Sequence, residues 1–538
     1  MNKNNEDRLL SKVIDFLSRY ENKYIYGAGQ RAERIYLILY AMQLKFQGFI
    51  VTEGKDNKTY KGKLVYPLSM IKDNIDRDTG IISGFLGGDE AVIRHYVGEK
   101  PGILCLEPLE ITMLLYRCVL LPVLKRVHAL YPIVPLLPKE EWRNILVVRL
   151  DVLGDLIMTT AFLRELRRNC PLTHIALVVR RSNAGLFANC PYIDELVLYD
   201  PLPGVPLTEQ TVQGQEILTS VENFIKNSSL AKRQWDVAFQ PQILLDGRSF
   251  LENFLVARAS KARCQIGRIN VLLPYHEYLA RIARPYMSLL IEEREEKHEV
   301  DYMLDLLRAC GLTIKDQRLE TWWEETAADR KVQDFLAIAG KEGWQLIVFC
   351  MTGSIATKNW QPANYGRLAK ELLNGHKSRR VIIVGDSNAA EAAVEMQQAV
   401  EDEKNRIIDL TGKTSLNDVG VILGHCCLYI GADTGIMHMA ASLQVPVVEI
   451  SMALSGCTAA THVAPQRMGP YGVKSRALMA EYPLDGCKNA CRKDFPHCIT
   501  AITVDRVLVA AQELLGDEMN GENQDNIPNK SDNWHNYL

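Results

Sequence analysis

The chain has 538 residues and carries 62 Lys and Arg against 65 Asp and Glu, which gives a formal net charge of −3. This even balance argues against a dedicated nucleic-acid binder, because such proteins usually present a strongly basic face. Hydrophobic residues make up 47% and charged residues 24%, which are ordinary globular values and exclude wholesale disorder. At about 150 residues per domain, the length predicts three or four domains.

The N-terminus is polar, with both signs of charge, and does not resemble a secretory signal peptide. No run reaches about 18 uncharged apolar residues, so we expect no membrane-spanning helix and a cytoplasmic location. The 13 cysteines are odd in number and lie mostly in apolar runs. This pattern favours reduced thiols over a disulfide framework.

Residues 1–110 are predicted to form a small Rossmann-like domain, because strand, helix and strand patterns alternate from residue 23 onward. Gly27, Gly29 and Ala32 form a Rossmann-type fingerprint between the first strand and the helix, and Glu53 follows the second strand. Such a pattern cradles a pyrophosphate and places an acid near a ribose. Binding of NAD or another nucleotide and a purely structural or regulatory role both remain open.

Residues 111–140 are predicted to be a linker, apolar with scattered basic side chains and closed by three prolines. We interpret this segment as a linker helix packed between domains. The alternative is a basic amphipathic segment that rests on a membrane surface.

Two further α/β segments follow, at residues 141–330 and 340–515, each with alternating strand and helix patterns. They predict two doubly wound halves that face a cleft, with ligands at the carboxyl ends of the strands. The last segment, residues 516–538, holds six Asn and almost no aliphatic side chains, and we expect it to be disordered.

The first candidate catalytic residue is Asp155, which follows a buried strand and the turn at Gly154. An Asp at the start of a helix can cap it by accepting the first amide protons. A carboxylate at the carboxyl end of a strand can instead take a proton from an attacking hydroxyl.

A second candidate site follows the strand that ends at Cys350. Thr352, Ser354 and Lys358 lie in a loop before the next helix. Hydroxyls, amides and one ammonium group are suited to an anion, although a surface loop with a solvated Lys would look the same.

The third and most specific site is the segment 429–441, in which a strand ends and a helix begins with Asp433-Thr434-Gly435. Free amides at the start of this helix, together with its dipole, predict a diphosphate site. His438 lies four residues after Thr434 and either faces the cleft or packs in the core.

These three motifs together resemble glycosyltransferase family 9, which includes the ADP-heptose:lipopolysaccharide heptosyltransferases. The resemblance covers about residues 143 to 515, in the family's order and spacing. Segments 190–196 and 410–416 also resemble the family, whereas Ala161 stands where the family often has Pro. The resemblance implies a GT-B architecture of two Rossmann-like domains and an inverting, metal-independent transfer that requires no cofactor.

The resemblance also implies a role for each motif residue. Asp155 matches the proposed catalytic base, and Lys358 matches the residue that neutralises the leaving nucleoside diphosphate. Asp433 matches a contact to the donor sugar. The remaining donor-binding candidates are Thr352, Ser354, Thr434, Gly435 and His438 near the phosphates and sugar, and Thr414 near the nucleobase.

The implied reaction is transfer of a sugar from a nucleotide-sugar donor, with ADP-heptose as the suspected donor. The implied acceptor is a lipopolysaccharide-type or other surface glycan, lipid-linked or oligosaccharide, with peripheral contact to the inner face of the cytoplasmic membrane. We expect no nucleic-acid partner. The alternatives are a nucleotide- or NAD-dependent oxidoreductase or epimerase that uses the N-terminal domain, and a non-catalytic nucleotide-sugar-binding scaffold.

Two further segments carry unusual side chains. Residues 257–284 hold six basic residues against one acid, which indicates either a solvated basic helix face or a site for an anionic glycolipid. Cys487, Cys491 and Cys498, with His497 adjacent, are spaced in a way that can hold zinc. Because Cys-x3-Cys with one further Cys is not a standard set of four ligands, we favour a structural thiol loop and predict no metal ligands.

Overall fold

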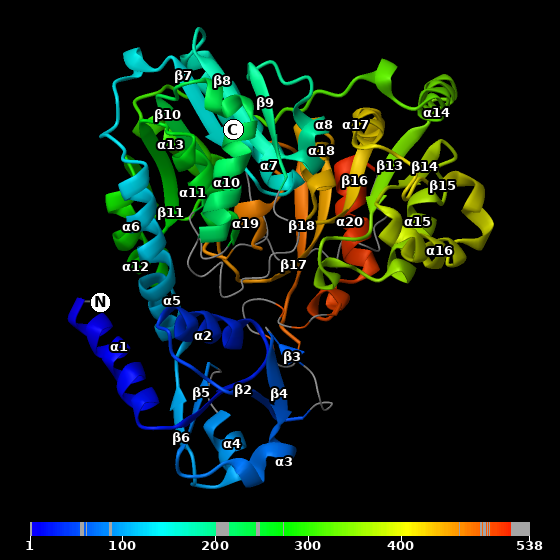
Figure 1. The fold of residues 1–538 in the computed structure, drawn as a ribbon. Helices are drawn as coiled ribbons and strands as arrows, with labels where there is room; N and C mark the ends of the chain where they lie inside the picture. The colour runs from blue at the N-terminus through cyan, green and yellow to red at the C-terminus, as the bar shows by residue number, and fades with distance from the viewer. Residues whose placement is uncertain are drawn as a thin grey trace. The chain divides into compact units, whose positions relative to one another are not determined.

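The computed structural model describes residues 3–53, 59–60, 62–84, 89–200, 215–243, 248–272, 274–461, 463–484, 487, 491, 493 and 495–517. The chain separates into two compact units, which are residues 1–148 with 199–294, and residues 149–198 with 295–538. Figure 1 traces both along the sequence. The five segments expected from the sequence do not have the boundaries of these two units, and the division into five segments stays a prediction.

The N-terminal sheet has the strand order β3-β4-β2-β1-β5-β6, as expected for a Rossmann-like fold, and all its pairs are parallel except β3 with β4. Its strands are β1 (Asn22–Tyr26), β2 (Gly48–Val51), β3 (Thr59–Tyr60), β4 (Lys63–Pro67), β5 (Thr79–Ser83) and β6 (Gly102–Cys105). Its helices are α1 (Lys3–Ser18), α2 (Gln30–Ala41), α3 (Leu68–Ile71) and α4 (Asp89–Val97). Tyr26, Ile50, Ile81 and Ile93 share one buried core.

The expected linker helix is two helices, α5 (Pro108–Leu115) and α6 (Leu121–Leu130), joined by a π-helical turn at Tyr116–Leu120. Many of their apolar side chains are buried, including Leu124 and Val127 at 0% exposure, whereas Leu130 at the end of α6 is exposed. Tyr116 stacks on Tyr278 with an interplanar angle of 11°. The apolar face of this segment is therefore covered within its own unit, which favours the linker interpretation over a membrane-surface one.

The second sheet has the order β12-β11-β10-β7-β8-β9, and β10 pairs in parallel with both β7 and β11. Its strands are β7 (Asn144–Val148), β8 (His174–Arg180), β9 (Glu195–Tyr199), β10 (Val237–Ile243), β11 (Cys264–Asn270) and β12 (Leu289–Glu293). The accompanying helices are α7 (Leu153–Asn169), α8 (Ala184–Phe187), α10 (Gln215–Asn227), α11 (Arg248–Ala259), α12 (Pro274–Ala283) and α13 (Glu299–Ala309).

The third sheet has the order β15-β14-β13-β16-β17-β18 and is parallel throughout. Its strands are β13 (Gln345–Cys350), β14 (Arg379–Ile383), β15 (Ile407–Asp409), β16 (Cys426–Ala432), β17 (Val447–Leu454) and β18 (Ser475–Ala480). Its helices are α14 (Arg330–Lys341), α15 (Pro362–Leu373), α16 (Ala390–Gln398), α17 (Leu416–Gly424), α18 (Gly435–Ser442), α19 (Pro465–Met468) and α20 (Val504–Leu515).

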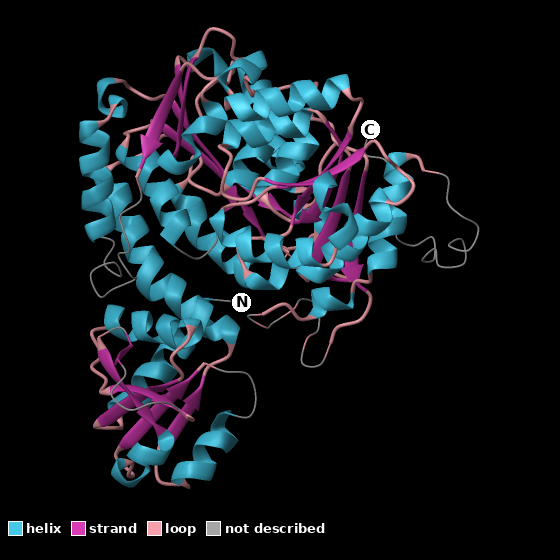
Figure 2. Ribbon diagram, turned by 90° about the vertical axis from the view of Figure 1, so that its right-hand side faces the viewer, coloured by secondary structure: helices cyan, strands magenta, loops and turns pink. Residues whose placement is uncertain are grey.

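The third sheet is held by apolar strands that are buried on both faces, as parallel sheets require. Ile347, Phe349, Ile383 and Ile430 alternate along their strands and join one core with side chains of α15, α16 and α20. Figure 2 shows the strands of this sheet between helices. Because the strands are parallel, the loops after β13, β14, β15 and β16 all leave from the same edge.

Helix caps fix where several of these helices begin and end. Ser415 and Asp418 form a reciprocal capping box at the start of α17. Thr503 caps α20, and Gly516 ends that helix in the left-handed conformation that glycine favours. Asp517 pairs with Arg379. Of the predicted disordered tail, 518–538 lie outside the described residues. Within the described ranges, no helix combines the length and apolar character that crossing a bilayer demands.

We predict that Gly431→Ala lowers the stability of the third sheet. A Cβ at Gly431 would lie 2.4 Å from the carbonyl oxygen of Cys350 and 2.8 Å from the hydroxyl of Tyr429, so β13 and β16 would have to separate. Overpacking of this kind costs about 1–3 kcal/mol of unfolding free energy. The melting temperature followed by circular dichroism measures the effect.

The matched control is Gly424→Ala at the end of α17, where an added Cβ meets nothing within 4 Å. Its melting temperature should equal that of the wild type or exceed it slightly. Equal stability of the two variants would contradict the close packing of β13 against β16.

Candidate active site

Two of the predicted motifs meet at the carboxyl edge of the third sheet. The loop after β13 ends in a 3-10 helix, η8 (Ala356–Lys358), and Asp433 directly follows β16. The Lys358 Nζ donates a 2.7 Å hydrogen bond to Oδ2 of Asp433 and a 3.1 Å hydrogen bond to its carbonyl oxygen. The sequence therefore predicted two residues that the fold joins in one ion pair.

The loop that carries Lys358 folds back on itself at Gly353. The Gly353 amide donates to Oδ1 of Asn359 at 2.8 Å. A Cβ at Gly353 would lie 2.8 Å from the Cβ of Lys358, so a side chain there would displace the lysine. Trp360, which is buried, closes the loop by donating to the Ile502 carbonyl at 2.9 Å. The local sequence thus holds Lys358 at a defined position beside β16.

Helix α18 begins at this site, as the sequence predicted. The Thr434 side chain caps it by accepting from the Met437 amide at 3.4 Å. The hydroxyls of Thr434 and Tyr429 lie 3.3 Å apart. The first amides of an α-helix have no partner inside the helix, so the amides that follow Thr434 are suited to bind an anion.

The first turns of α7 and α18 pack closely because each contains a glycine. A Cβ at Gly435 would lie 2.7 Å from Leu153, and a Cβ at Gly154 would lie 2.7 Å from Cδ2 of His438. This contact places Asp155, in the first turn of α7, near the Lys358–Asp433 pair. Val152, rather than Asp155, is the N-cap residue of α7, and its side chain makes no capping hydrogen bond. The capping interpretation of Asp155 is therefore wrong.

Burial and neighbouring charges set the protonation of Asp155. Burial and then the negative charge of Asp151 raise the pKa of Asp155 to about 7, although the positive charge of Arg149 lowers it. Arg149 is buried, and its NH2 donates to Oδ1 of Asp155 at 3.3 Å. The Arg149 Nε lies 3.1 Å from Oδ2 of Asp151. A carboxylate with this pKa can accept a proton near neutral pH.

His438 contacts the same cluster but carries no charge at neutral pH. Its side chain is buried, and Nε2 lies 3.9 Å from Oδ1 of Asp433. Burial lowers the pKa of His438 to about 4, although the charge of Asp433 favours the protonated form. His438 is therefore a neutral imidazole packed between α7 and Asp433 rather than a cation for phosphates.

The sequence analysis missed two members of this site, Arg149 and Glu449. Glu449 lies on β17, is 1% exposed, and its Oε2 has no hydrogen-bond partner in the described part of the chain. Burial and then the charge of Asp433 raise the pKa of Glu449 to about 8, while Ser451 and Lys358 lower it. The available indication was a charged residue directly after the apolar strand β7 for Arg149, and one within the apolar strand β17 for Glu449.

The other predicted donor-binding residues lie at the same edge of the sheet. Thr352 is half-buried, and an added Cβ at Gly385 would lie 3.8 Å from its hydroxyl and 3.7 Å from Cγ2 of Thr411. Ser354 is exposed. Thr414 is half-buried in the loop after β15, where Gly412 has a φ of +67°. These residues line the edge without bonding to the Lys358–Asp433 pair, and their roles stay predictions.

The N-terminal fingerprint residues lie at the carboxyl edge of β1 and β2. Gly27 has a φ of +98°, and its amide donates to the Ile50 carbonyl at 2.7 Å. Gly29 is the N-cap of α2, Ala32 is buried, and Glu53 is exposed after β2. The backbone therefore has the expected form, and nucleotide binding there stays a prediction.

The interpretation of residues 257–284 as one solvated basic helix face is wrong. The segment is not one helix, because it contains the end of α11, β11, α12 and a 3-10 turn. Arg258 and Arg268 are buried, and they bond internally to Gln265 and Glu293, respectively. Arg284 forms an ion pair with Glu292. Two of the six positive charges are therefore internal, whereas Lys261, Arg281 and Arg284 are exposed and do not share one helix face.

We predict that Glu449→Gln changes how stability depends on pH. The pKa of Glu449 is near 8 in the folded protein against about 4.5 in the unfolded chain. Between these two pH values the native state keeps a proton on Glu449 that the unfolded state has released. The free energy of unfolding therefore falls because of Glu449 as the pH rises from about 4.5 to about 8. The variant lacks this loss, and its unfolding free energy relative to wild type should rise over that window by on the order of a few kcal/mol.

Urea unfolding at pH 5, 7 and 9 measures this difference. The control is Glu395→Gln on the exposed face of α16, which should follow the wild type at each pH. A constant offset between Glu449→Gln and wild type at all three pH values would show that Glu449 titrates normally.

Comparisons with known proteins agree with this arrangement. Residues 280–494 match the model of glycosyltransferase family 9 (heptosyltransferase). Lipooligosaccharide heptosyltransferase 2 of Haemophilus ducreyi is 21% identical over 69% of this chain and 99% of its own length. The enzyme of the same name from Haemophilus influenzae is 27% identical over 60% of this chain and 86% of its own length.

A solved structure, the glycosyl transferase family 9 from Veillonella parvula, covers 69% of this chain and 97% of its own length. Its TM-score is 0.54 at 22% identity. The expected fold class is confirmed, with two Rossmann-like sheets of the GT-B type after an N-terminal Rossmann-like sheet that also has six strands. The resemblance predicted from the sequence is confirmed as well, because residues 280–494 match the model of that family, and the chain is a glycosyltransferase.

Proposed function

We propose that this protein is an inverting, metal-independent heptosyltransferase that transfers a sugar from ADP-heptose to a lipopolysaccharide-type or other surface-glycan acceptor. The observation that carries the proposal is the juxtaposition of Asp155 with the Lys358–Asp433 pair and the start of α18. This arrangement places a base beside an anion site. The names of the two Haemophilus relatives support heptose as the sugar.

Asp155 is the proposed catalytic base. Its carboxylate takes the proton of the acceptor hydroxyl while that oxygen attacks the anomeric carbon of the donor. The bond between this carbon and the diphosphate oxygen breaks in the same displacement, so the configuration inverts and the nucleoside diphosphate leaves. Arg149 fixes the orientation of the Asp155 carboxylate through its 3.3 Å hydrogen bond.

The leaving diphosphate is bound by Lys358 and the first amides of α18. A lysine ammonium has three protons, and two of them bond to Asp433, so one is available for a phosphate oxygen. The amides of Gly435 and Ile436, with the helix dipole, stabilise the rest of the charge. Preorganised protein donors of this kind take the place of a metal ion in stabilising the developing charge.

Asp433 is the proposed contact to the donor sugar. Its carboxylate is held by Lys358 and lies beside the neutral His438, so it can accept hydrogen bonds from sugar hydroxyls. Thr352 and Ser354 are proposed to donate to phosphate oxygens, and Thr414 to lie near the nucleobase. We further propose that the protein is cytoplasmic and meets a lipid-linked acceptor at the membrane surface. The names of the relatives, which are lipooligosaccharide heptosyltransferases, support this proposal.

We predict that Asp155→Asn abolishes transfer while donor binding remains. Loss of a positioned base lowers kcat by about 10²–10⁴-fold. In the wild type, kcat/KM should rise with pH through about 7, because burial raises the pKa of Asp155 to that value and only the ionised form accepts the proton. Steady-state rates between pH 5.5 and 9 measure both effects.

The control for Asp155→Asn is Asp329→Asn at the N-cap of α14, where Asn also caps a helix. Its rates and pH profile should match those of the wild type. Transfer by Asp155→Asn at wild-type rates would remove Asp155 from the role of base.

We predict that nucleotides of the donor stabilise the protein through Lys358. A ligand at about 100 times its Kd adds about 2.7 kcal/mol to the free energy of unfolding. ADP and ADP-heptose should raise the melting temperature, and Lys358→Met should abolish most of that shift because the phosphate loses its cation. The same melting-temperature shifts are measured with UDP, GDP, CDP and NAD.

Lys341→Met, an exposed position at the end of α14, should keep the full shift. A shift with another nucleoside diphosphate that Lys358→Met abolishes would change the donor and keep the reaction. A shift with NAD alone, equal in both variants, would favour an oxidoreductase or epimerase that uses the N-terminal fingerprint. The absence of a shift with any nucleotide would contradict the proposed donor site.

A further inference from the structure

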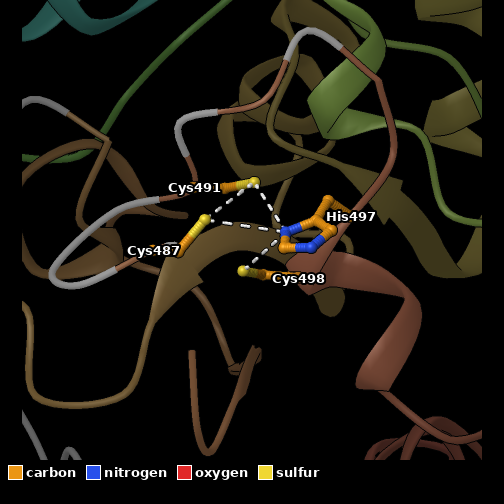
Figure 3. Close-up of side chains that lie close together, drawn as sticks. All are labelled: Cys487, Cys491, His497 and Cys498. Carbon is orange, nitrogen blue, oxygen red and sulfur yellow. Dashed lines mark hydrogen bonds between the residues drawn. The ribbon is translucent and has the colours of Figure 1, made fainter. Parts of the chain in front are cut away.

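Four side chains converge in the segment between β18 and α20 (Figure 3). The Nδ1 atom of His497 lies 3.6 Å from Sγ of Cys487, 3.8 Å from Sγ of Cys491 and 3.4 Å from Sγ of Cys498. The Sγ atoms of Cys487 and Cys491 are 3.9 Å apart. All four atoms lie within 4.8 Å of one another, so the histidine that the sequence places beside Cys498 joins the three cysteines in one cluster.

A single hydrogen bond at Nδ1 of His497 does not account for this arrangement. A ring nitrogen of histidine has one proton to donate or one lone pair to accept with, yet three sulfur atoms surround the same Nδ1. A disulfide does not explain it either, because bonded sulfurs lie about 2.05 Å apart. The four atoms therefore share a common centre that none of them occupies.

The distances fit the edges of a tetrahedron around a metal ion. With zinc at about 2.3 Å from sulfur and about 2.0 Å from nitrogen, tetrahedral geometry requires about 3.8 Å between two sulfurs and about 3.5 Å between sulfur and nitrogen. Four of the six separations, one of 3.9 Å between sulfurs and three of 3.4 to 3.8 Å between sulfur and nitrogen, are close to these values, and the other two are at most 4.8 Å. Three thiolates and an imidazole are also soft ligands, which favour zinc over magnesium or calcium.

We propose that Cys487, Cys491, Cys498 and Nδ1 of His497 bind a zinc ion in a closed tetrahedral site. Four protein ligands leave no open position for water or substrate, so this zinc is structural and takes no part in the transfer reaction. This proposal replaces the preference for a metal-free thiol loop drawn from the sequence, because the fold places Nδ1 of His497 beside all three sulfur atoms.

The zinc site would position the loop that carries Lys358. Cys498 begins a 3-10 helix, η11 (Cys498–Ala501), and Ile499 and Ile502 share one core with Trp360. Trp360, which follows Lys358 by two residues in the sequence, donates to the Ile502 carbonyl at 2.9 Å. Cys487 and Cys498 also pack with Leu454 and Ala480, at the ends of β17 and β18. A metal here would fasten an otherwise irregular segment to both strands.

Metal analysis of the purified full-length protein tests the proposal without reference to activity. We expect about one zinc ion per chain. Substitution by cobalt should give the visible absorption of a tetrahedral thiolate site, and X-ray absorption should show about three sulfurs at about 2.3 Å and one nitrogen at about 2.0 Å. Folded protein that contains no zinc and does not bind it on addition would overturn the proposal, and so would iron at these ligands.

Matched variants assign the ligands. Cys491→Ser should lose the zinc on dialysis, whereas Cys310→Ser, an equally half-buried thiol at the end of α13, should keep it. Unchanged zinc content in Cys491→Ser would overturn the assignment. If Cys491→Ser does not fold, chelation of the wild type replaces it. Three thiols should then become reactive for each zinc released, and zinc should restore the melting temperature.

Discussion

The close approach of α7 and α18 is the constraint on which the candidate active site depends. Gly154 and Gly435 each lie where a Cβ would come within 2.7 Å of the other helix. Only a backbone without side chains at both positions allows the two first turns to meet. Because Asp155 follows one glycine and Asp433 precedes the other by two residues, this packing determines how far the proposed base lies from the proposed donor site.

The same packing concentrates negative charge in a buried region. The charge of Asp433 acts on both Asp155 and Glu449, while Arg149 opposes it at Asp155 and Lys358 opposes it at Glu449. Carboxylates in such surroundings hold protons more tightly, which explains why the pKa values of Asp155 and Glu449 rise to about 7 and about 8. Lys358 in turn keeps Asp433 paired at 2.7 Å. The cluster therefore couples the protonation of the base to the charge of whatever occupies the donor site.

Much of this arrangement could be predicted from the sequence, because alternating strands and helices force the loops after parallel strands to one edge. Asp155, Lys358 and Asp433 were found in this way, each in the segment that follows a buried strand. Arg149 and Glu449 were missed because Arg149 directly follows β7 and Glu449 lies within β17, and an isolated charge beside or within an apolar strand has no periodicity to mark it. The basic segment at 257–284 misled for the opposite reason, since charge counts do not reveal that Arg258 and Arg268 are buried.

The proposed base and the proposed leaving-group site are held in place by different parts of the fold. Asp155 is oriented by Arg149 at the end of β7 and by the first turn of α7. Lys358 is held by the fold of its loop at Gly353 and by Trp360, which bonds to the segment after η11. Among the hydrogen bonds of the described residues, none joins Arg149 or Asp155 to the Cys487–Cys498 segment. Loosening that segment should therefore weaken the binding of the leaving group through Lys358 first, and should reach the base only through the charge of Asp433, which is paired with Lys358 and raises the pKa of Asp155.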